Sequence, residues 1–322
     1  MKQLSSPLLW LRDGPEEVQS LAAGLDLVRT AAHKDASHAW LCMIANGTAH
    51  YLSTYASSEL LSRWYVGDNE LYGVVAPVGR LRTGTDGGLV LDGSWRFGSG
   101  SHRAAVMAMG CEPVAGRRTT VLVDRDRLEV VHPWEGPGLL ATASHTLRAS
   151  GVRVSPPDIV DMTDVPAGRP VGIYADPDLF LANMPGVAIG LAERLLALLG
   201  PSPVPGAWQA TYADAVARSI LARRGLTGML HSFDALARAG QLALFSPALR
   251  QEFLLMLSAS YHVGLDAALA LAERCDSTDP EVRQQLEQAR VDIAIMRPHG
   301  AMRPSRLVSG QPGSPAPEWM SR

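Results

Sequence analysis

The chain has 322 residues, of which 47% are hydrophobic and 19% charged, and its formal net charge is -3 at pH 7. The length and the apolar fraction are sufficient for a large buried core, and the charge gives no reason to expect a nucleic-acid partner. The three cysteines lie far apart and without metal-ligand spacing, which is typical of proteins from a reducing compartment. We therefore expect a cytoplasmic protein without a metal site.

The first region, residues 1–70, has the pattern of helices. Between Glu16 and His33 the apolar residues recur at every third or fourth position, which predicts an amphipathic helix. Asp35 or Ser37 can cap a second helix, which contains Trp40.

The second region, residues 71–176, has the pattern of short strands that are rich in Val and Leu and separated by Gly, Pro and Asp. Such strands indicate a sandwich or barrel of modest size. The expected strands are Tyr72–Ala76, Leu89–Leu91, Trp95–Phe97, Ala105–Met109, Thr120–Val123, Leu128–Val131 and Val152–Val154.

The third region, residues 177–300, is dominated by Ala and Leu and returns to a helical pattern. Its most apolar stretch, Leu181–Leu199, is interrupted by a proline and two charged residues, so we expect a buried helix and no membrane partner. Residues 301–322 are rich in Pro, Ser and Gly and are expected to form a flexible tail. The expected helices are Val187–Leu199, Tyr212–Arg224, Ser232–Ala239, Pro247–Glu273 and Pro280–Met296.

The most informative motif is Gly87–Gly100, which reads GGLVLDGSWRFGSG. Paired glycines mark a turn, a short strand and a second turn follow, and an aromatic strand then ends in a Ser-Gly corner. Ser99 and Gly100 would present a hydroxyl and backbone N–H groups beside Trp95 and Phe97. This arrangement suits a planar heterocycle with polar atoms along one edge. The alternative is an ordinary hairpin with two core aromatic residues.

A second motif is the loop within Trp134–Thr146, which contains the Thr-x-Ser pair Thr142 and Ser144. Their side chains and backbone can donate hydrogen bonds to phosphate or ring oxygens. Considered alone, such a pair is also an ordinary polar loop.

A third motif lies near the C-terminus, where Arg290, Asp292 and His299 occur within Gln288–Gly300. Seven residues are about two helical turns, so Asp292 and His299 could share one face of a helix. The alternative for His299 is a histidine at a frayed helix end, where the macrodipole favours it.

Together with Asp35–Trp40, these motifs resemble the acyl-CoA dehydrogenase fold, in particular its branch of two-component flavin-dependent monooxygenases. The resemblance extends from about Asp35 to Gly300. It implies an α+β protein with a helical region (1–70), a central β-domain (71–176), a C-terminal helical domain (177–300) and a tail (301–322).

The resemblance also implies the chemistry. Reduced flavin, either FMN or FAD, would come from a separate reductase and react with O2 and a small aromatic or biosynthetic intermediate, in a homodimer or homotetramer. The residues implied at the flavin are Trp95, Phe97, Ser99, Gly100, Thr142 and Ser144. Those implied at the substrate are Trp40, Asn46, Thr48 and His50, although a partly exposed helix end is an alternative for His50. The catalytic set is Ser99 with His299 as an acid or base that Asp292 orients.

Two departures from the family keep other functions open. The first helices of the fold are expected to be shortened, and the helical region after Pro201 is compressed. An acyl-CoA dehydrogenase would need a carboxylate base where the C-terminal motif offers His299, and Glu193 is better explained by a salt bridge. A non-catalytic scaffold relative is the third possibility.

Overall fold

The computed structural model describes residues 20–64, 70–165, 177–201, 206–239, 241, 246–275 and 277–303. Their packing divides the chain into two compact units. Unit 1 takes the described residues of 44–135 and 140–180, and unit 2 takes those of 20–43, 136–139 and 181–303.

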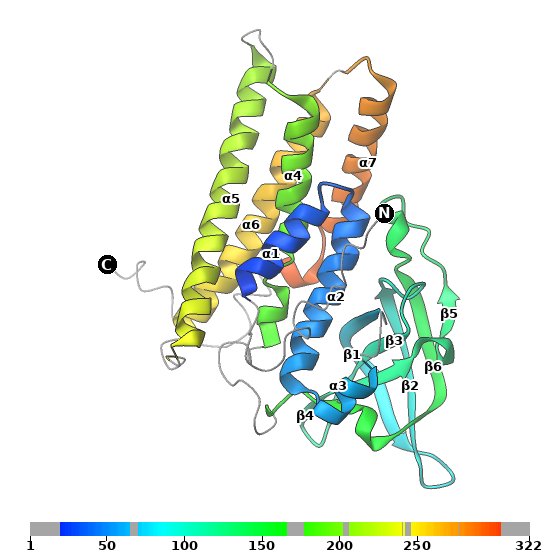
Figure 1. Ribbon diagram of the computed structural model, residues 1–322. Helices are drawn as coiled ribbons and strands as arrows, with labels where there is room; N and C mark the ends of the chain where they lie inside the picture. Colours follow the sequence, from blue (N-terminus) through cyan, green and yellow to red (C-terminus); the bar gives the residue numbers. More distant parts are fainter. Residues whose placement is uncertain are drawn as a thin grey trace. The chain divides into compact units, whose positions relative to one another are not determined.

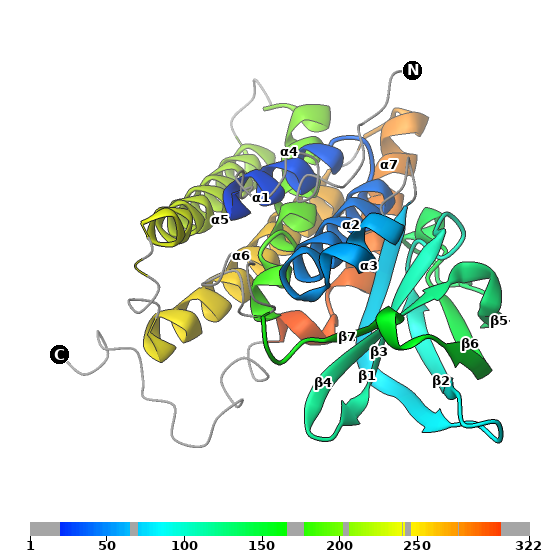
Figure 2. The ribbon, with the colours of Figure 1, turned by 60° about the horizontal axis from the view of Figure 1, so that its bottom comes forward.

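Unit 1 is built on a seven-stranded sheet with the order β5-β6-β2-β1-β3-β4-β7 (Figure 2). All neighbouring strands are antiparallel except β1 and β3, which run parallel. The strands are β1 Leu71–Thr83, β2 Leu89–Gly98, β3 Val106–Val114, β4 Arg117–Asp124, β5 Glu129–His132, β6 His145–Val154 and β7 Ile159–Asp161.

The long strand β1 joins the two halves of this sheet. Its first half pairs with β3, its last residues pair with β2, and the register shifts between Val74 and Gly79. The indole of Trp95 is fully buried beside this shift, and its Nε1–H donates to the carbonyl of Gly110 (2.8 Å). A Cβ added at Gly79 or Gly93 would lie 2.5 or 2.6 Å from the Trp95 ring, so both glycines leave the space that the indole fills.

Helices cover one face of the sheet in unit 1. The part of α2 (Ala36–Tyr55) from Ile44 onward and α3 (Ser58–Trp64) supply Tyr51, Leu52 and Leu60 to a buried cluster with β1, β3, β4 and β7. The α2 segment therefore has a fixed apolar face against the sheet.

The predicted strands are located correctly, with one error in their connection. A turn was expected between Leu89–Leu91 and Trp95–Phe97, but β2 runs through both. Gly93 is not at a turn, because its missing side chain makes room for the Trp95 ring. The sheet also gains β7, which the sequence pattern did not predict.

Unit 2 is a helical bundle in which α6 contacts α4, α5 and α7, while α1 contacts α4 and α5 (Figure 1). The N-terminus of α1 is capped twice: Leu21 N–H donates to the buried Asp234 carboxylate of α5 (3.0 Å), and Ala23 N–H donates to Ser20 Oγ (2.9 Å). The helices are α1 Leu21–Ala31, the first part of α2, α4 Pro185–Leu199, α5 Ala207–Arg238, α6 Pro247–Arg274 and α7 Pro280–Met296.

Glycines let the backbones of α1, α4 and α6 approach closely. A Cβ added at Gly190 of α4 would collide with the backbone oxygen of Arg29 on α1. A Cβ at Gly264 of α6 would lie 2.9 Å from the backbone of Ala188 on the other side of α4. The centre of the bundle thus depends on backbone-to-backbone packing at these two positions.

The expected helix Pro280–Met296 is confirmed as α7, but Tyr212–Arg224 and Ser232–Ala239 form the single helix α5. The prediction left residues 225–231, which include Gly225 and Gly228, outside both helices. The structure keeps the helix intact there because the buried Leu226 and Leu230 continue its apolar stripe. Residues 16–19 of the first expected helix, the prolines within 202–205 and tail residues 304–322 lie outside the described residues.

Within the described part of the chain, Leu179–Leu199 and Pro247–Arg274 are long and apolar enough to cross a membrane. In the structure, 78% and 56% of their apolar windows are buried. Burial in the bundle explains the apolar character of these segments, as expected for Leu181–Leu199.

Replacing Gly190 with alanine should lower the free energy of unfolding by about 1–3 kcal/mol, because the added methyl group forces α1 and α4 apart. Gly228→Ala is the matched control, since no atom lies within 4 Å of the added Cβ. It should raise stability by about 1 kcal/mol through helix propensity alone. Urea denaturation of the two variants tests this, and equal effects would show that close packing at Gly190 is unimportant.

Candidate functional site

Three buried hydroxyl groups form a connected corner in unit 1. Ser144 Oγ lies 2.7 Å from Ser99 Oγ and 2.7 Å from Thr142 Oγ1. All three residues are less than 10% exposed. The structure thus brings together residues from two segments that are more than 40 positions apart, as the sequence motifs predicted for the site.

The backbone around this corner is held in unusual conformations. Gly100 has φ of 82°, donates its N–H to the carbonyl of Thr142 (2.8 Å), and packs so closely on the Tyr72 ring that a Cβ would collide with it. Ala143 has φ of 44°, in a region that residues with side chains seldom adopt. Such strain tends to concentrate at functional sites, so the corner is a candidate binding site.

Phe97 lies beside the corner and faces outward. Its φ is 62°, and its side chain is 55% exposed. The ring makes an edge contact with Trp134 at 6.1 Å between centroids, and the Arg96 guanidinium lies 4.9 Å from its centre. An exposed, strained aromatic residue with fixed neighbours presents a flat apolar surface.

Trp95 occupies a different environment from the one predicted. The Gly87–Gly100 motif and the resemblance placed it beside Phe97 at a cofactor. Its ring is fully buried beside Gly79 and Gly93. Its only polar atom, Nε1, donates its hydrogen to the carbonyl of Gly110. We correct its assignment to a core residue that supports the strand carrying Phe97 and Ser99.

Asp292 on α7 anchors a loop segment of unit 2. Its Oδ1 accepts hydrogen bonds from Leu139 N–H (2.7 Å) and Gln288 Nε2 (2.9 Å). Leu139 has φ of 50°, and a Cβ at Gly138 would lie 2.6 Å from the carbonyl oxygen of Val291. Burial raises the pKa of Asp292, while the hydrogen bonds from Leu139 and Gln288 oppose that rise.

His299 does not share a helix face with Asp292, because α7 ends at Met296 and His299 lies in the following turn. Its ring instead meets the buried Trp40 edge to face, with 5.3 Å between centroids. The structure thus joins one predicted catalytic residue to one predicted substrate residue. The hydrogen bonds of Asp292 go to Leu139 and Gln288, and its role in orienting His299 stays a prediction.

The other predicted substrate residues lie in the middle of α2. Asn46, Thr48 and His50 are all at most 4% exposed. His50 is therefore not a partly exposed helix-end residue, since α2 continues to Tyr55. Thr48 faces the sheet, where its Oγ1 would lie 3.0 Å from a Cβ at Gly73.

The sequence motifs did not identify Trp134, Leu139 and Tyr72 as parts of these sites. Trp134 N–H donates to Nδ1 of His145 (2.8 Å), so this nitrogen carries no proton. Burial and the nearby Arg125 lower the pKa of His145, which favours this neutral form. Trp134 and Leu139 both lie within the motif Trp134–Thr146, but the positive φ values of Phe97 and Leu139 had no signal in the sequence.

Among the described residues, no group of three or more His, Cys, Asp or Glu side chains could hold a metal ion. Glu193 forms ion pairs with Arg29 and Arg223, as expected for a structural carboxylate.

No protein-family model and no curated protein sequence matches this chain. Solved structures do match. The HsaA monooxygenase from M. tuberculosis is 20% identical, with a TM-score of 0.81 over 94% of this chain and 84% of that one. XiaF from Streptomyces sp., solved with FADH2 and glycerol, is 17% identical, with a TM-score of 0.75 over 97% of this chain and 87% of that one.

Dibenzothiophene monooxygenase TdsC from Paenibacillus sp. A11-2 is 17% identical, with a TM-score of 0.73 over 96% of this chain and 89% of that one. TdsC has also been solved with FMN and indole. The chain therefore has the mixed helix-and-sheet fold of these monooxygenases, and this expectation from the sequence motifs is confirmed.

Asp292→Ala should lower the free energy of unfolding by about 1–3 kcal/mol, because it removes the acceptor of the Leu139 N–H. Asp292→Asn keeps an acceptor oxygen and should retain most of the stability. Because its pKa is raised, wild-type Asp292 stabilises the fold most when protonated. The wild-type advantage over Asp292→Asn should fall as pH rises from about 3.9, the unfolded carboxyl value, through the raised pKa.

Urea denaturation between pH 3 and pH 8 measures both effects. A wild-type advantage that instead grows with pH would show that hydrogen bonding, and not burial, dominates the ionisation of this carboxyl group.

Proposed function

We propose that this protein is a flavin-dependent monooxygenase that uses reduced flavin and O2 to hydroxylate a small aromatic substrate. The observation that carries the proposal is the hydroxyl corner of Ser99, Thr142 and Ser144 in a chain with the fold of known monooxygenases. The finer layout of the acyl-CoA dehydrogenase fold, with its β-domain between two helical regions, belongs to the same proposal.

The residues of the corner fit an isoalloxazine ring. Flavin offers a flat apolar ring with oxygen and nitrogen atoms along one edge. Ser99, Ser144 and Thr142 form a chain of hydroxyl groups, and since their two mutual hydrogen bonds use two of the three protons, the chain can donate one O–H to such an edge. The exposed Phe97 supplies a flat apolar surface next to them. Reduced flavin, when bound, supplies the electrons with which one atom of O2 enters the substrate and the other leaves as water.

The protein's own part is to hold polar and apolar groups in fixed positions. The Gly100-to-Thr142 hydrogen bond fixes the two loops of the corner, so the hydroxyl groups need little reorganisation when a ligand binds. The edge contact with Trp134 helps to hold the exposed Phe97 ring in its orientation.

His299 is proposed as the acid or base. An imidazole can accept a proton from a phenolic hydroxyl and return it near neutral pH. The edge-to-face contact with Trp40 restricts the plane of the His299 ring, which limits the directions from which it can reach a substrate. Asn46 and His50 remain candidates for substrate contacts.

The proposal includes the features that accompany this function in the family: a separate flavin reductase, a cytoplasmic location and a homodimer or homotetramer. The choice between FMN and FAD is left to measurement with both.

The decisive experiment supplies the protein with reduced FMN or FAD, 18O2 and a panel of phenols and indoles. A hydroxylated product that carries one 18O atom supports the proposal. Bleaching of bound oxidised flavin by an acyl-CoA, without oxygen transfer, would instead establish a dehydrogenase. Failure of both flavins to bind in either redox state would establish a non-catalytic relative.

Two variants assign the roles. Ser99→Ala should weaken binding of reduced flavin about tenfold, through the loss of a buried hydrogen bond, whereas Ser155→Ala on an exposed loop should have no effect.

His299→Ala should lower turnover by roughly 10²–10⁴-fold and change flavin affinity little, with the exposed His132→Ala as its control. Wild-type turnover in His299→Ala would move the proton-transfer role to His50.

A further inference from the structure

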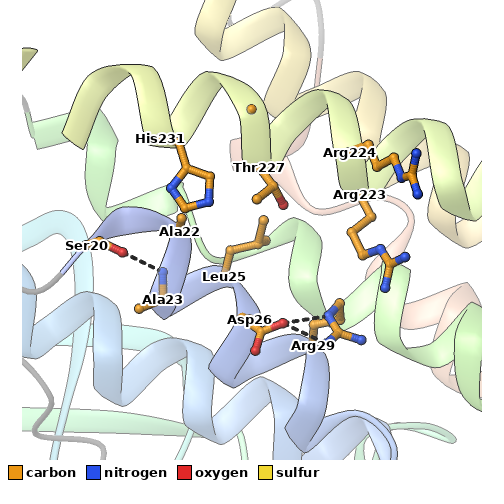
Figure 3. A pocket seen from close by; sticks show the side chains of 11 residues that line it. Ser20, Ala22, Ala23, Leu25, Asp26, Arg29, Arg223, Arg224, Thr227 and His231 are labelled. Carbon is orange, nitrogen blue, oxygen red and sulfur yellow. Dashed lines mark hydrogen bonds and ion pairs between the residues drawn. The ribbon is translucent and has the colours of Figure 1, made fainter. Parts of the chain in front are cut away.

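A groove between α1 and α5 lies wholly within unit 2 and contains none of the residues proposed above for catalysis or flavin binding. Its volume is about 660 Å³, within the range of small-molecule sites. Figure 3 shows His231 at the end of the groove beside Ser20, and Arg223 at the end beside Arg29.

Small apolar residues line the middle of the groove. Ala22 and Ala23 of α1 lie opposite Thr227 of α5, and Gly228 also lines the groove. No atom lies within 4 Å of a Cβ added at Gly228, so the groove has open space at that point. A flat apolar group could lie there without displacing any side chain.

One end of the groove carries an excess of positive charge. Arg29 pairs with Asp26 (2.6 Å) and with Glu193, and Arg223 reaches Glu193 at 3.4 Å. The third arginine, Arg224, forms no ion pair within the described part of the chain. Three guanidinium groups against two carboxylates leave one net positive charge, and both carboxylates are already engaged.

The N-terminus of α1, at the other end, does not offer free donors to a ligand. Its first N–H groups are bound by Asp234 and by Ser20 Oγ. The groove therefore has arginine side chains at one end, from α1 and α5, and His231 of α5 at the other. The two ends are separated by eight residues, or roughly 12 Å of helix, which is about the length of a two-ring molecule with one charged group.

We propose that this groove binds an organic anion in which a phosphate or carboxylate group is attached to an apolar body. Arg224, assisted by Arg223, contacts the anionic group, because guanidinium groups bind the oxygens of both kinds of anion. The apolar body lies over Ala22, Ala23 and Gly228. The inference depends on unit 2 alone and does not require the proposed oxygenase activity.

Calorimetric titration of the full chain with four probes tests the ligand class. 2-Naphthyl phosphate and 2-naphthoate should bind saturably, and the tighter of the two identifies the preferred anion. 2-Naphthol, which lacks the charge, and inorganic phosphate, which lacks the apolar body, should bind at least tenfold more weakly. If inorganic phosphate binds as well as naphthyl phosphate, or if no probe binds, the proposal is wrong.

Variants of α5 place the ligand in the groove. Arg224→Gln should weaken binding of the better naphthyl probe about tenfold, whereas Arg218→Gln, which removes an exposed pair with Asp214 on the same helix, should leave it within about twofold. Gly228→Leu should abolish binding by filling the groove. Gly225→Leu, outside the groove, controls for the change in helix propensity.

Thermal unfolding verifies that each variant is folded. Unchanged binding in both Arg224→Gln and Gly228→Leu would place the probe elsewhere and overturn the proposal. A change of molar mass in light scattering caused by Gly228→Leu would also overturn it, because the groove would then be covered by a second copy of the chain.

Discussion

Burial of the Trp95 indole is the interaction on which unit 1 depends. The ring fills the space left by Gly79 and Gly93 at the point where β1 passes from one half of the sheet to the other. Its hydrogen bond to Gly110 fixes the ring in place. Strand alternation would place Phe97 on the same face as Trp95, but Phe97 is exposed and has a left-handed φ, which changes its side-chain direction. The strand β2, which leads directly into Ser99 of the hydroxyl corner, is therefore held in place by Trp95.

Unit 2 is stabilised by a different means. Its central helices approach through Gly190 and Gly264, so that backbone atoms lie where side chains would ordinarily be. Close packing of this kind permits little adjustment, because a single added methyl group meets main-chain atoms. Asp292 belongs to α7 of this bundle, and its carboxylate accepts the N–H of Leu139, whose φ is positive. A carboxylate that the sequence motif associated with catalysis thus acts on the loop backbone.

Each unit contains one of the residue groups singled out above. Unit 1 contains the hydroxyl corner and the exposed Phe97 ring, and unit 2 contains the His299 imidazole in contact with the Trp40 indole. The groove between α1 and α5 belongs to neither set. Its net positive charge arises because three arginines face two carboxylates. Asp26 pairs with Arg29, and Glu193 pairs with Arg29 and Arg223, so the charge of Arg224 is not balanced.

The sequence alone determined the order of helices and strands and the fold that its motifs resemble. It also assigned Ser99, Thr142 and Ser144, which the structure brings into contact, to one site. These follow from periodicity and from short motifs, which are local properties of the chain. The placement of Trp95, Phe97 and His299 was decided by the tertiary structure. The Trp95 ring is buried because Gly79 and Gly93 leave room for it. His299 lies outside a helix, since α7 ends at Met296. Such outcomes depend on neighbours that are remote in sequence, and periodicity carries no information about them.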